Sequence, residues 1–163
     1  RLATGGKGRL VKRSMIVSAV LDALGICKVP ILSVIGDFSL ENEAQLSSAL
    51  SGWDLDADAL TLAGERIVNL ERLYNVRQGL SRADDRLPAR FLEEAVPLFG
   101  FERDAETGSL QQSTEPIGHA QIYDFEAMLD RYYDLRGWSH DGIPTAATLQ
   151  RLGLEAQGRG VVS

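Results

Sequence analysis

Apolar residues recur at intervals of three and four along much of this chain, and a glycine follows most of these segments. Residues 10–24 show the pattern clearly, with Leu10, Val17 and Leu24 on one helical face and Gly25 directly after them. Such spacing predicts an α-helix, and glycine readily adopts the left-handed conformation that ends one. The sequence therefore predicts a chain built mainly from helices that stop at glycines.

The same reasoning places the other helices. Ser39 is expected to cap a helix that runs to Leu50, and Asp56 a longer one that ends at Gly79. Asp124 opens a helix that Gly137 ends, and Thr145 caps a last short one, after which the tail beyond residue 154 is expected to fray. A short helical turn is expected at 87–92. Residues 101–122 lack this periodicity and predict a long loop with room for a hairpin.

These segments together predict an all-α fold, an irregular helical domain of about five to seven helices. The length of 163 residues suits one domain. A net charge of −6 and a pI near 4.9 argue against nucleic-acid binding, which requires a basic stripe. No apolar run approaches the ~18 residues that a membrane span needs. The single cysteine excludes an internal disulfide framework and fits a cytoplasmic, reducing location.

Two groups of polar residues admit two interpretations each. A basic cluster near the start forms either a solvated helix face or a contact with an acidic partner or a phosphate: Lys7, Arg9, Lys12 and Arg13. The helix after Asp56 carries polar residues on several faces, so some are expected to be buried and paired with carboxylates. They form either a salt-bridge network that holds helices together or a group with a direct catalytic role. The polar set is Arg66, Asn69, Arg72, Asn75 and Arg77, and its candidate partners are Glu71, Asp84 and Asp85.

Most other residue types that could carry chemistry lack the right neighbours. His119 and His140 fall in predicted loops without a second ligand nearby, so both are expected at the surface. The glycine-rich segment 4–8 has neither the preceding strand nor the spacing of a phosphate-binding loop. The adjacent acids Asp84 and Asp85 suit a turn or a helix cap. None of these motifs predicts an active site.

Segment 22–27 is different, because it places a carboxylate and a thiol on either side of a glycine turn. Asp22 lies in the last turn of the first predicted helix, and Cys27 follows Gly25 and Ile26. A carboxylate can accept paired hydrogen bonds from an amino-pyrimidine edge such as that of a pterin. A thiolate is the usual ligand of an iron–sulfur cluster. By itself, however, the segment fits a buried, inert cysteine better than a ligand.

Segment 22–27 resembles the Asp-x-x-Gly-[Leu/Ile]-Cys pattern of the aldehyde ferredoxin oxidoreductase family. Segments 64–79, 84–91 and 132–145 resemble later parts of that family in the same order, and the resemblance covers about residues 10–154. It implies that this chain is a C-terminal helical domain, spanning residues 1–163, whose upstream pterin-binding and cluster-binding parts lie elsewhere. The segment alone is not expected to be active.

The resemblance also implies specific roles and cofactors. Asp22 would hold the amino edge of a pterin, Ile26 would contribute backbone contacts, and Cys27 would ligate a 4Fe–4S cluster. In this family two pterins hold the tungsten through dithiolene sulfurs. The implied reaction oxidises aldehydes to carboxylic acids and passes electrons through the cluster to ferredoxin or an electron-transfer subunit. The implied partners include the remainder of the same enzyme, in a homo- or hetero-oligomer.

Two other functions remain open on the sequence alone. One is the tungsten subunit of a benzoyl-CoA reductase-type complex, which residues lining the substrate would distinguish. The other is a helical interaction module that kept the scaffold and lost the cofactor. The presence of both Asp22 and Cys27 argues against the second, because a drifted scaffold has no need of either.

Overall fold

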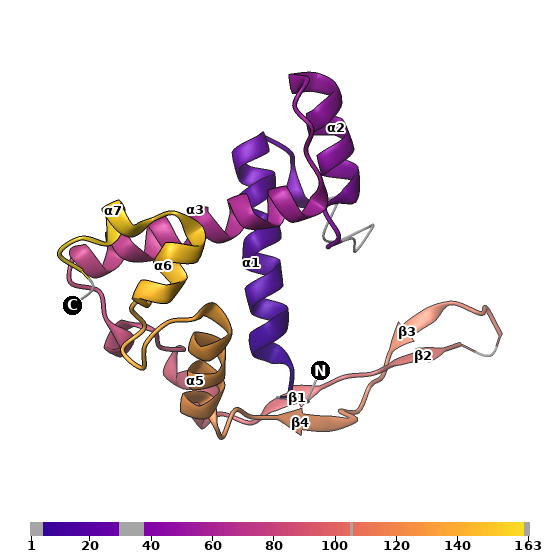
Figure 1. Cartoon of the computed structure of the whole chain (residues 1–163). Coiled ribbons are helices and arrows are strands. Elements are labelled where there is room, and N and C mark those ends of the chain that lie inside the picture. Colours follow the sequence, from indigo (N-terminus) through magenta and orange to yellow (C-terminus); the bar gives the residue numbers. More distant parts are fainter. Residues whose placement is uncertain (1–4, 30–37, 105, 162–163) are drawn as a thin grey trace.

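The computed structural model describes residues 5–29, 38–104 and 106–161, and within them the fold is mostly helical (Figure 1). Its elements are α1 (Lys7–Leu24), α2 (Glu41–Ser51), α3 (Ala57–Arg77), α4 (Ala89–Glu93), α5 (Phe125–Arg136), α6 (Ala146–Leu152) and α7 (Glu155–Gly158), with four short strands between α4 and α5. The prediction of a mostly helical domain of five to seven helices is confirmed. None of the described helices is long and apolar enough to cross a membrane.

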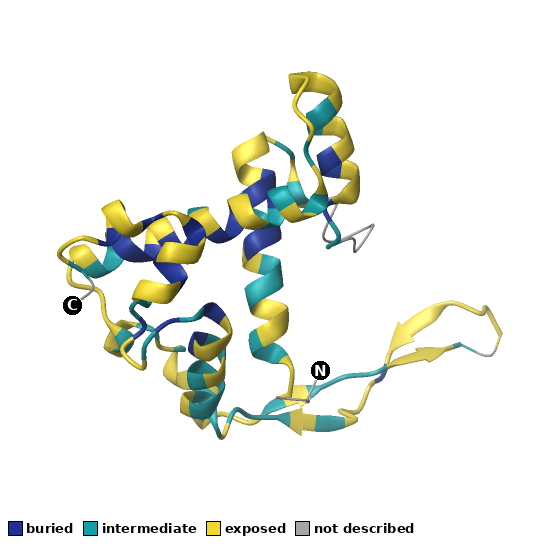
Figure 2. Ribbon diagram, viewed as in Figure 1, coloured by how far each residue is buried: buried dark blue, intermediate teal, exposed yellow. Residues whose placement is uncertain are grey.

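Helices α1 and α3 cross at the centre of the molecule, and their backbones approach closely at Gly64. A Cβ atom built on Gly64 would lie 2.7 Å from the Ile16 carbonyl oxygen and 2.9 Å from a Val20 methyl group. A glycine is therefore needed at this crossing. Figure 2 shows that buried residues concentrate along these two helices and under the C-terminal helices.

We expect Gly64→Ala to destabilise the fold, because the added methyl group meets backbone as well as flexible side chains. Overpacking of this kind costs about 1–3 kcal/mol. Urea unfolding followed by circular dichroism measures the loss. Gly118→Ala is the matched control, since a Cβ there meets nothing within 4 Å. Equal midpoints for the two variants would contradict the close approach.

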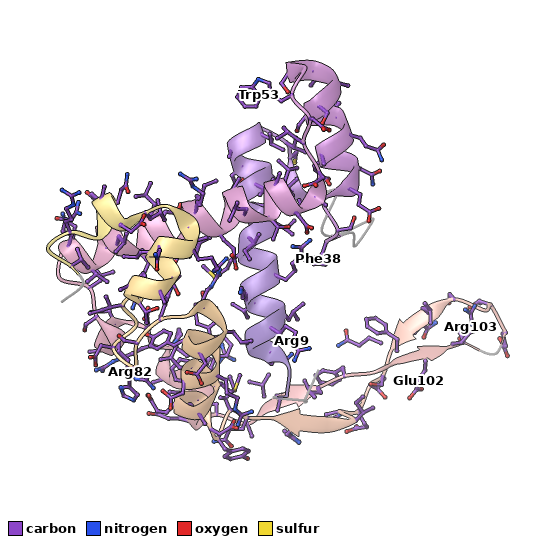
Figure 3. The ribbon with its side chains drawn as sticks, viewed as in Figure 1. Arg9, Phe38, Trp53, Arg82, Glu102 and Arg103 are labelled. Atoms are coloured by element: carbon purple, nitrogen blue, oxygen red, sulfur yellow. The ribbon has the colours of Figure 1, made fainter. Side chains whose placement is uncertain are left out.

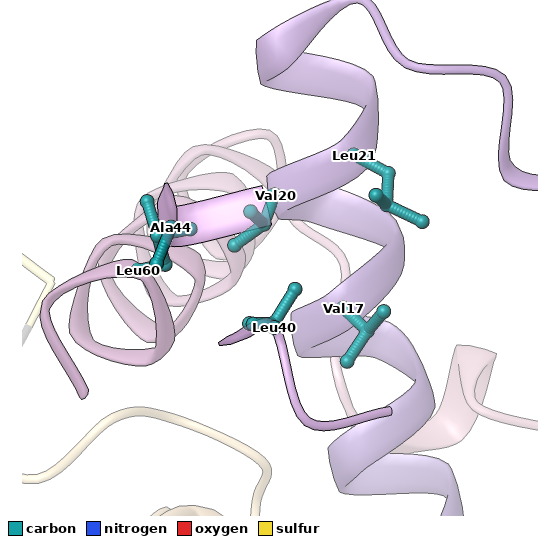
Figure 4. Close-up of a cluster of buried hydrophobic side chains, with 6 residues drawn as sticks. All are labelled: Val17, Val20, Leu21, Leu40, Ala44 and Leu60. Carbon is teal, nitrogen blue, oxygen red and sulfur yellow. The ribbon is translucent and has the colours of Figure 1, made fainter. Parts of the chain in front are cut away.

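One hydrophobic cluster joins α1, α2 and the start of α3 (Figure 4). Leu40 lies inside it with only 1% of its surface exposed, although its backbone is left-handed with φ 67°. This conformation is unfavourable for leucine, so burial of the side chain stabilises a strained backbone here. The N-terminal cap of α2 is Leu40. The sequence predicted the cap one residue earlier, at Ser39. The other predicted caps, Asp56 and Thr145, accept backbone hydrogen bonds as expected.

Glu65 on α3 forms ion pairs that link this helix to α1 and to α6. Its carboxylate lies 2.9 Å from Lys12 Nζ on α1 and 2.6 Å from Arg151 Nη1 on α6. Burial alone would raise the pKa of Glu65, but the hydrogen bonds from Arg151 and Lys12 outweigh it and lower the pKa. The carboxylate is therefore ionised at neutral pH despite its burial.

The predicted polar set on α3 is buried only in part. Arg72 is buried, and its guanidinium donates to both carboxylate oxygens of Asp85 at 3.1 and 2.7 Å and to the Gly142 carbonyl oxygen at 2.7 Å. Asn69 is also buried and accepts from Trp138 Nε1 at 2.8 Å. Arg66 and Arg77 are exposed, so the predicted buried pairing holds for Arg72 and is wrong for these two. Ser81 caps the short 3-10 helix Arg82–Asp84, and the Asp84 carboxylate accepts from the Ser81 N–H, which fits the turn predicted there.

Residues 96–120 form a two-part β-ribbon, hereafter the arm, where the sequence predicted a long loop with room for a hairpin. Strand β1 (Val96–Leu98) pairs with β4 (Gly118–Ala120), and β2 (Phe101–Arg103) pairs with β3 (Leu110–Gln112), both antiparallel. The arm extends away from the helices and is largely exposed (Figures 1 and 2). The expected fraying after residue 154 also differs from the structure, because α7 adds one helical turn there.

Candidate functional site

The loop after α1 has a well-defined backbone that comes directly from its sequence. Gly25 is left-handed with φ 71°, and its N–H donates to the Asp22 carbonyl oxygen at 3.2 Å. The Ile26 N–H donates to the Leu21 carbonyl oxygen at 2.9 Å. This pair of hydrogen bonds is the Schellman motif, which ends a helix and reverses the chain sharply.

The side chains of this turn point in different directions. Ile26 packs against the cluster that contains Leu21, which is the apolar contact that usually accompanies a Schellman motif. Cys27 is exposed, as expected for a thiol that the turn presents outward. The structure therefore brings Asp22, Ile26 and Cys27 into one turn, anchored by Ile26.

Lys28 is a neighbour of this turn that the sequence reasoning missed. Its ammonium group lies 2.8 Å from the Asp22 carboxylate, and both side chains are substantially exposed. The signal in the sequence is a lysine six residues after an aspartate, which the glycine turn folds back onto it. The pair therefore adds a cation beside Cys27 and occupies one oxygen of Asp22.

Within the part of the chain that the structure describes, Cys27 does not belong to a group of side chains that could hold a metal ion. There, no three histidine, cysteine, aspartate or glutamate side chains gather closely enough to hold a metal ion. His119 and His140 are exposed, as predicted. Cys27 can thus supply one ligand to a site completed by another segment.

A cavity of about 610 Å³ lies among α1, α3 and α5, and no sequence motif predicted it. Its apolar wall includes Val11 and Met15 of α1 and Phe125 of α5, and Lys7 lies at its edge. Nine residues of helix separate Met15 from the end of α1, or about 13 Å at 1.5 Å per residue. The cavity is therefore distinct from the Cys27 turn.

Arg72, Asp85 and Tyr133 also line this cavity and form a closed polar network. The Tyr133 hydroxyl donates to the Asp85 carboxylate, and the Arg72 guanidinium donates to the same carboxylate. Burial, together with the hydrogen bond to Asp85, raises the pKa of Tyr133 well above its usual value. Tyr133 therefore remains a donor throughout the physiological range, and the network is a structural joint between α3, the Asp85 turn and α5.

Comparison with known proteins gives consistent matches. Residues 1–154 match the family model described as aldehyde ferredoxin oxidoreductase, domains 2 and 3. Similar curated proteins include tungsten-containing aldehyde ferredoxin oxidoreductases from Pyrococcus horikoshii, 36% identical over 140 residues, and Thermococcus kodakarensis, 34% identical over 139 residues. Each alignment covers 85% of this chain and 20% of the relative, so the chain spans about a fifth of their length.

A solved structure shares the fold. It is described as the active site complex BamBC of benzoyl coenzyme A reductase in complex with 1,5-dienoyl-CoA. The TM-score is 0.66 at 24% identity, and the match covers 99% of this chain and 22% of the other. At this identity the likeness concerns the fold alone.

Proposed function

Because this chain belongs to the aldehyde ferredoxin oxidoreductase family, we propose that it is the C-terminal helical part of a tungsten-pterin enzyme that oxidises aldehydes to carboxylic acids. The observation that carries this proposal is the turn at Gly25. It joins the family's Asp-x-x-Gly-[Leu/Ile]-Cys pattern to a backbone that holds Cys27 outward beside Asp22.

Cys27 fits the role of a ligand to a 4Fe–4S cluster. Its thiol is exposed, and its backbone position follows from the Schellman turn and the partly buried Ile26. Such a cluster needs four cysteine thiolates, and this chain contains one cysteine. The other three would come from the rest of the enzyme, which accounts for about four-fifths of the length of its relatives.

Asp22 fits the role of a pterin ligand. A carboxylate on the last turn of α1 offers two oxygens, and the ammonium group of Lys28 occupies one of them at 2.8 Å. The other oxygen can accept from the amino edge of a pterin, and the backbone at Ile26 would add contacts beside it. The ion pair with Lys28 orients the Asp22 carboxylate on this side of the turn.

The bound groups would supply the redox chemistry, with tungsten held by two pterins accepting electrons from the aldehyde and the cluster carrying them onward. The residues of this chain would position those groups. Asp22 and Ile26 would orient a pterin, and Cys27 would supply one ligand to the cluster. The electrons would leave to ferredoxin or an electron-transfer subunit, and a cytoplasmic location fits both cofactors and acceptor.

The curated relatives favour aldehyde oxidation over the two alternatives. Their identity of 34–36% is higher than the 24% shared with the benzoyl coenzyme A reductase complex. A helical module without cofactor would leave the exposed pair of Asp22 and Cys27 without a role. Substrate assays separate these functions: full-length enzyme containing tungsten should reduce a viologen dye with aldehydes. Turnover only with an aromatic acyl-CoA, or enzyme that lacks tungsten, would overturn the proposal.

A substitution at Asp22 tests the pterin contact more directly. Asp22→Ala in the full-length enzyme removes a charged acceptor, and hydrogen bonds to charged groups contribute about 1.5–3 kcal/mol. We therefore expect the pterin cofactor to be retained roughly ten- to a hundredfold less tightly. Tungsten and pterin content after gel filtration measure this retention. Asp54→Ala, at another exposed aspartate, should retain both, and full retention in Asp22→Ala would exclude the contact.

A further inference from the structure

The ion pair at the end of α1 exists because of the turn that follows this helix. Asp22 and Lys28 are six residues apart, and on a continuous helix such residues would point to different faces. The left-handed Gly25 reverses the chain, and the partly buried Ile26 packs the reversed segment against the core. The Lys28 ammonium group thereby lies 2.8 Å from a carboxylate oxygen of Asp22.

This pair contributes little to the folding of the chain. The Asp22 side chain is 61% exposed and that of Lys28 is 44% exposed. Water screens ion pairs in such settings, so they add little stability. Glu65, by contrast, is buried and links α3 to α1 and α6. A role at the site therefore fits the Asp22–Lys28 pair better than a role in the fold.

Both members of the pair keep hydrogen-bonding capacity. An ammonium group has three donors, and a carboxylate offers about four acceptor positions on its two oxygens. Among the residues that the structure describes, each side chain uses one of these positions on the other. Two donors of Lys28 and one oxygen of Asp22 therefore remain for a ligand. The turn presents an acceptor and a donor side by side, and the exposed Cys27 is the residue before Lys28.

An acceptor beside a donor is complementary to the pyrimidine edge of a pterin. That edge carries an amino group, a ring N–H and a carbonyl oxygen, in this order. A carboxylate can accept from the amino group and the ring N–H, but it has no donor for the carbonyl oxygen. The ammonium group of Lys28, held against the Asp22 carboxylate, supplies such a donor.

We propose that Lys28 is a second pterin-binding residue of this turn, which donates to the ring carbonyl oxygen while Asp22 accepts from the amino group. This inference rests on the proposed function and deepens it, because it assigns the carbonyl end of the edge to a residue. The pair then selects for the order of donors and acceptors along the edge. A ring with an amino group in place of the carbonyl oxygen sets a donor against the ammonium group, and the turn disfavours it.

The rate of pterin release from the full-length enzyme tests this contact, followed by the fluorescence of the released and oxidised pterin. Lys28→Met removes the donors but keeps a long side chain, so release should be roughly tenfold faster than in the wild type. Lys28→Arg keeps a charged donor and should release the pterin more slowly than Lys28→Met. Arg9, an exposed cation near the start of α1, provides the control (Figure 3). Arg9→Met should release the pterin at the wild-type rate, and an unchanged rate in Lys28→Met would overturn the proposal.

A double variant separates a direct contact from an effect that acts through Asp22. If Lys28 only orients the carboxylate, Lys28→Met has no further effect once Asp22 is replaced by alanine. A direct contact predicts that the Asp22→Ala, Lys28→Met double variant releases the pterin faster than Asp22→Ala alone. Equal rates for these two would refute the Lys28 contact and leave Asp22 as the pterin ligand. Wild-type retention in Asp22→Ala would instead contradict the proposed function, so the two failures are distinguishable.

Discussion

Replacing Cys27 with serine or alanine in the full-length enzyme is expected to abolish or strongly alter the electron paramagnetic resonance signal of the reduced cluster. Serine is nearly the same size, but its alkoxide is a harder and far more basic ligand than a thiolate. Alanine supplies no ligand. Electron delivery to a ferredoxin should fall further than reduction of the tungsten by aldehyde, because in the proposed function the cluster would lie on the route to the acceptor.

Tungsten content should fall less than the cluster signal, since the dithiolene sulfurs come from the pterins. Val29→Ala provides the control, because Val29 is 63% exposed and lies two residues beyond Cys27. If both Cys27 variants kept an unchanged cluster signal, the cysteine would have no part in electron transfer. The family assignment would stand in that case.

Arg72→Ala should cause the largest loss of stability among substitutions on α3. Arg72 is buried and forms an ion pair with Asp85, which also accepts a hydrogen bond from Tyr133. Removing one partner of a buried ion pair costs roughly 3–5 kcal/mol, because the other charge is left without compensation. Chemical unfolding gives the change in free energy. Arg66→Ala, on the same helix but exposed, should change stability by about 0.5 kcal/mol or less.

Tyr133→Phe separates the two halves of the network. It leaves the Arg72–Asp85 pair in place and removes one donor, so its effect should lie between those of Arg66→Ala and Arg72→Ala. A near-neutral Arg72→Ala would mean that solvent compensates Asp85, which is 30% exposed.

The helices were predictable because their ends are local. Gly25, Gly52 and Gly137 all have positive φ and end helices, as the sequence indicated. Asp56 and Thr145 cap helices through side-chain oxygens, which also depends only on neighbours within three residues. The candidate turn was predictable for the same reason, since its two hydrogen bonds join residues within segment 21–26.

The remaining features depend on contacts between distant segments. Leu40 adopts a left-handed backbone because the core buries its side chain, and no local signal marks it. Arg72 is buried while Arg66 and Arg77 are not, because Asp85 and the Gly142 carbonyl lie only on its side of α3. The cavity requires three helices to meet. Such features follow from tertiary packing, which a periodic pattern cannot specify.

The Schellman turn has a consequence for how the enzyme matures. Ile26 is partly buried against the cluster formed by α1, Leu40, α2 and α3, and Cys27 is the next residue. The turn itself is local, but its place relative to the rest of the fold depends on the packing of these helices. In a chain that has not yet folded, the backbone at Cys27 would have no fixed position. Its thiolate could not then serve as the proposed fourth ligand of a cluster. If Cys27 ligates a cluster as proposed, cluster insertion would then act as a checkpoint that rejects polypeptides whose C-terminal part has not yet folded.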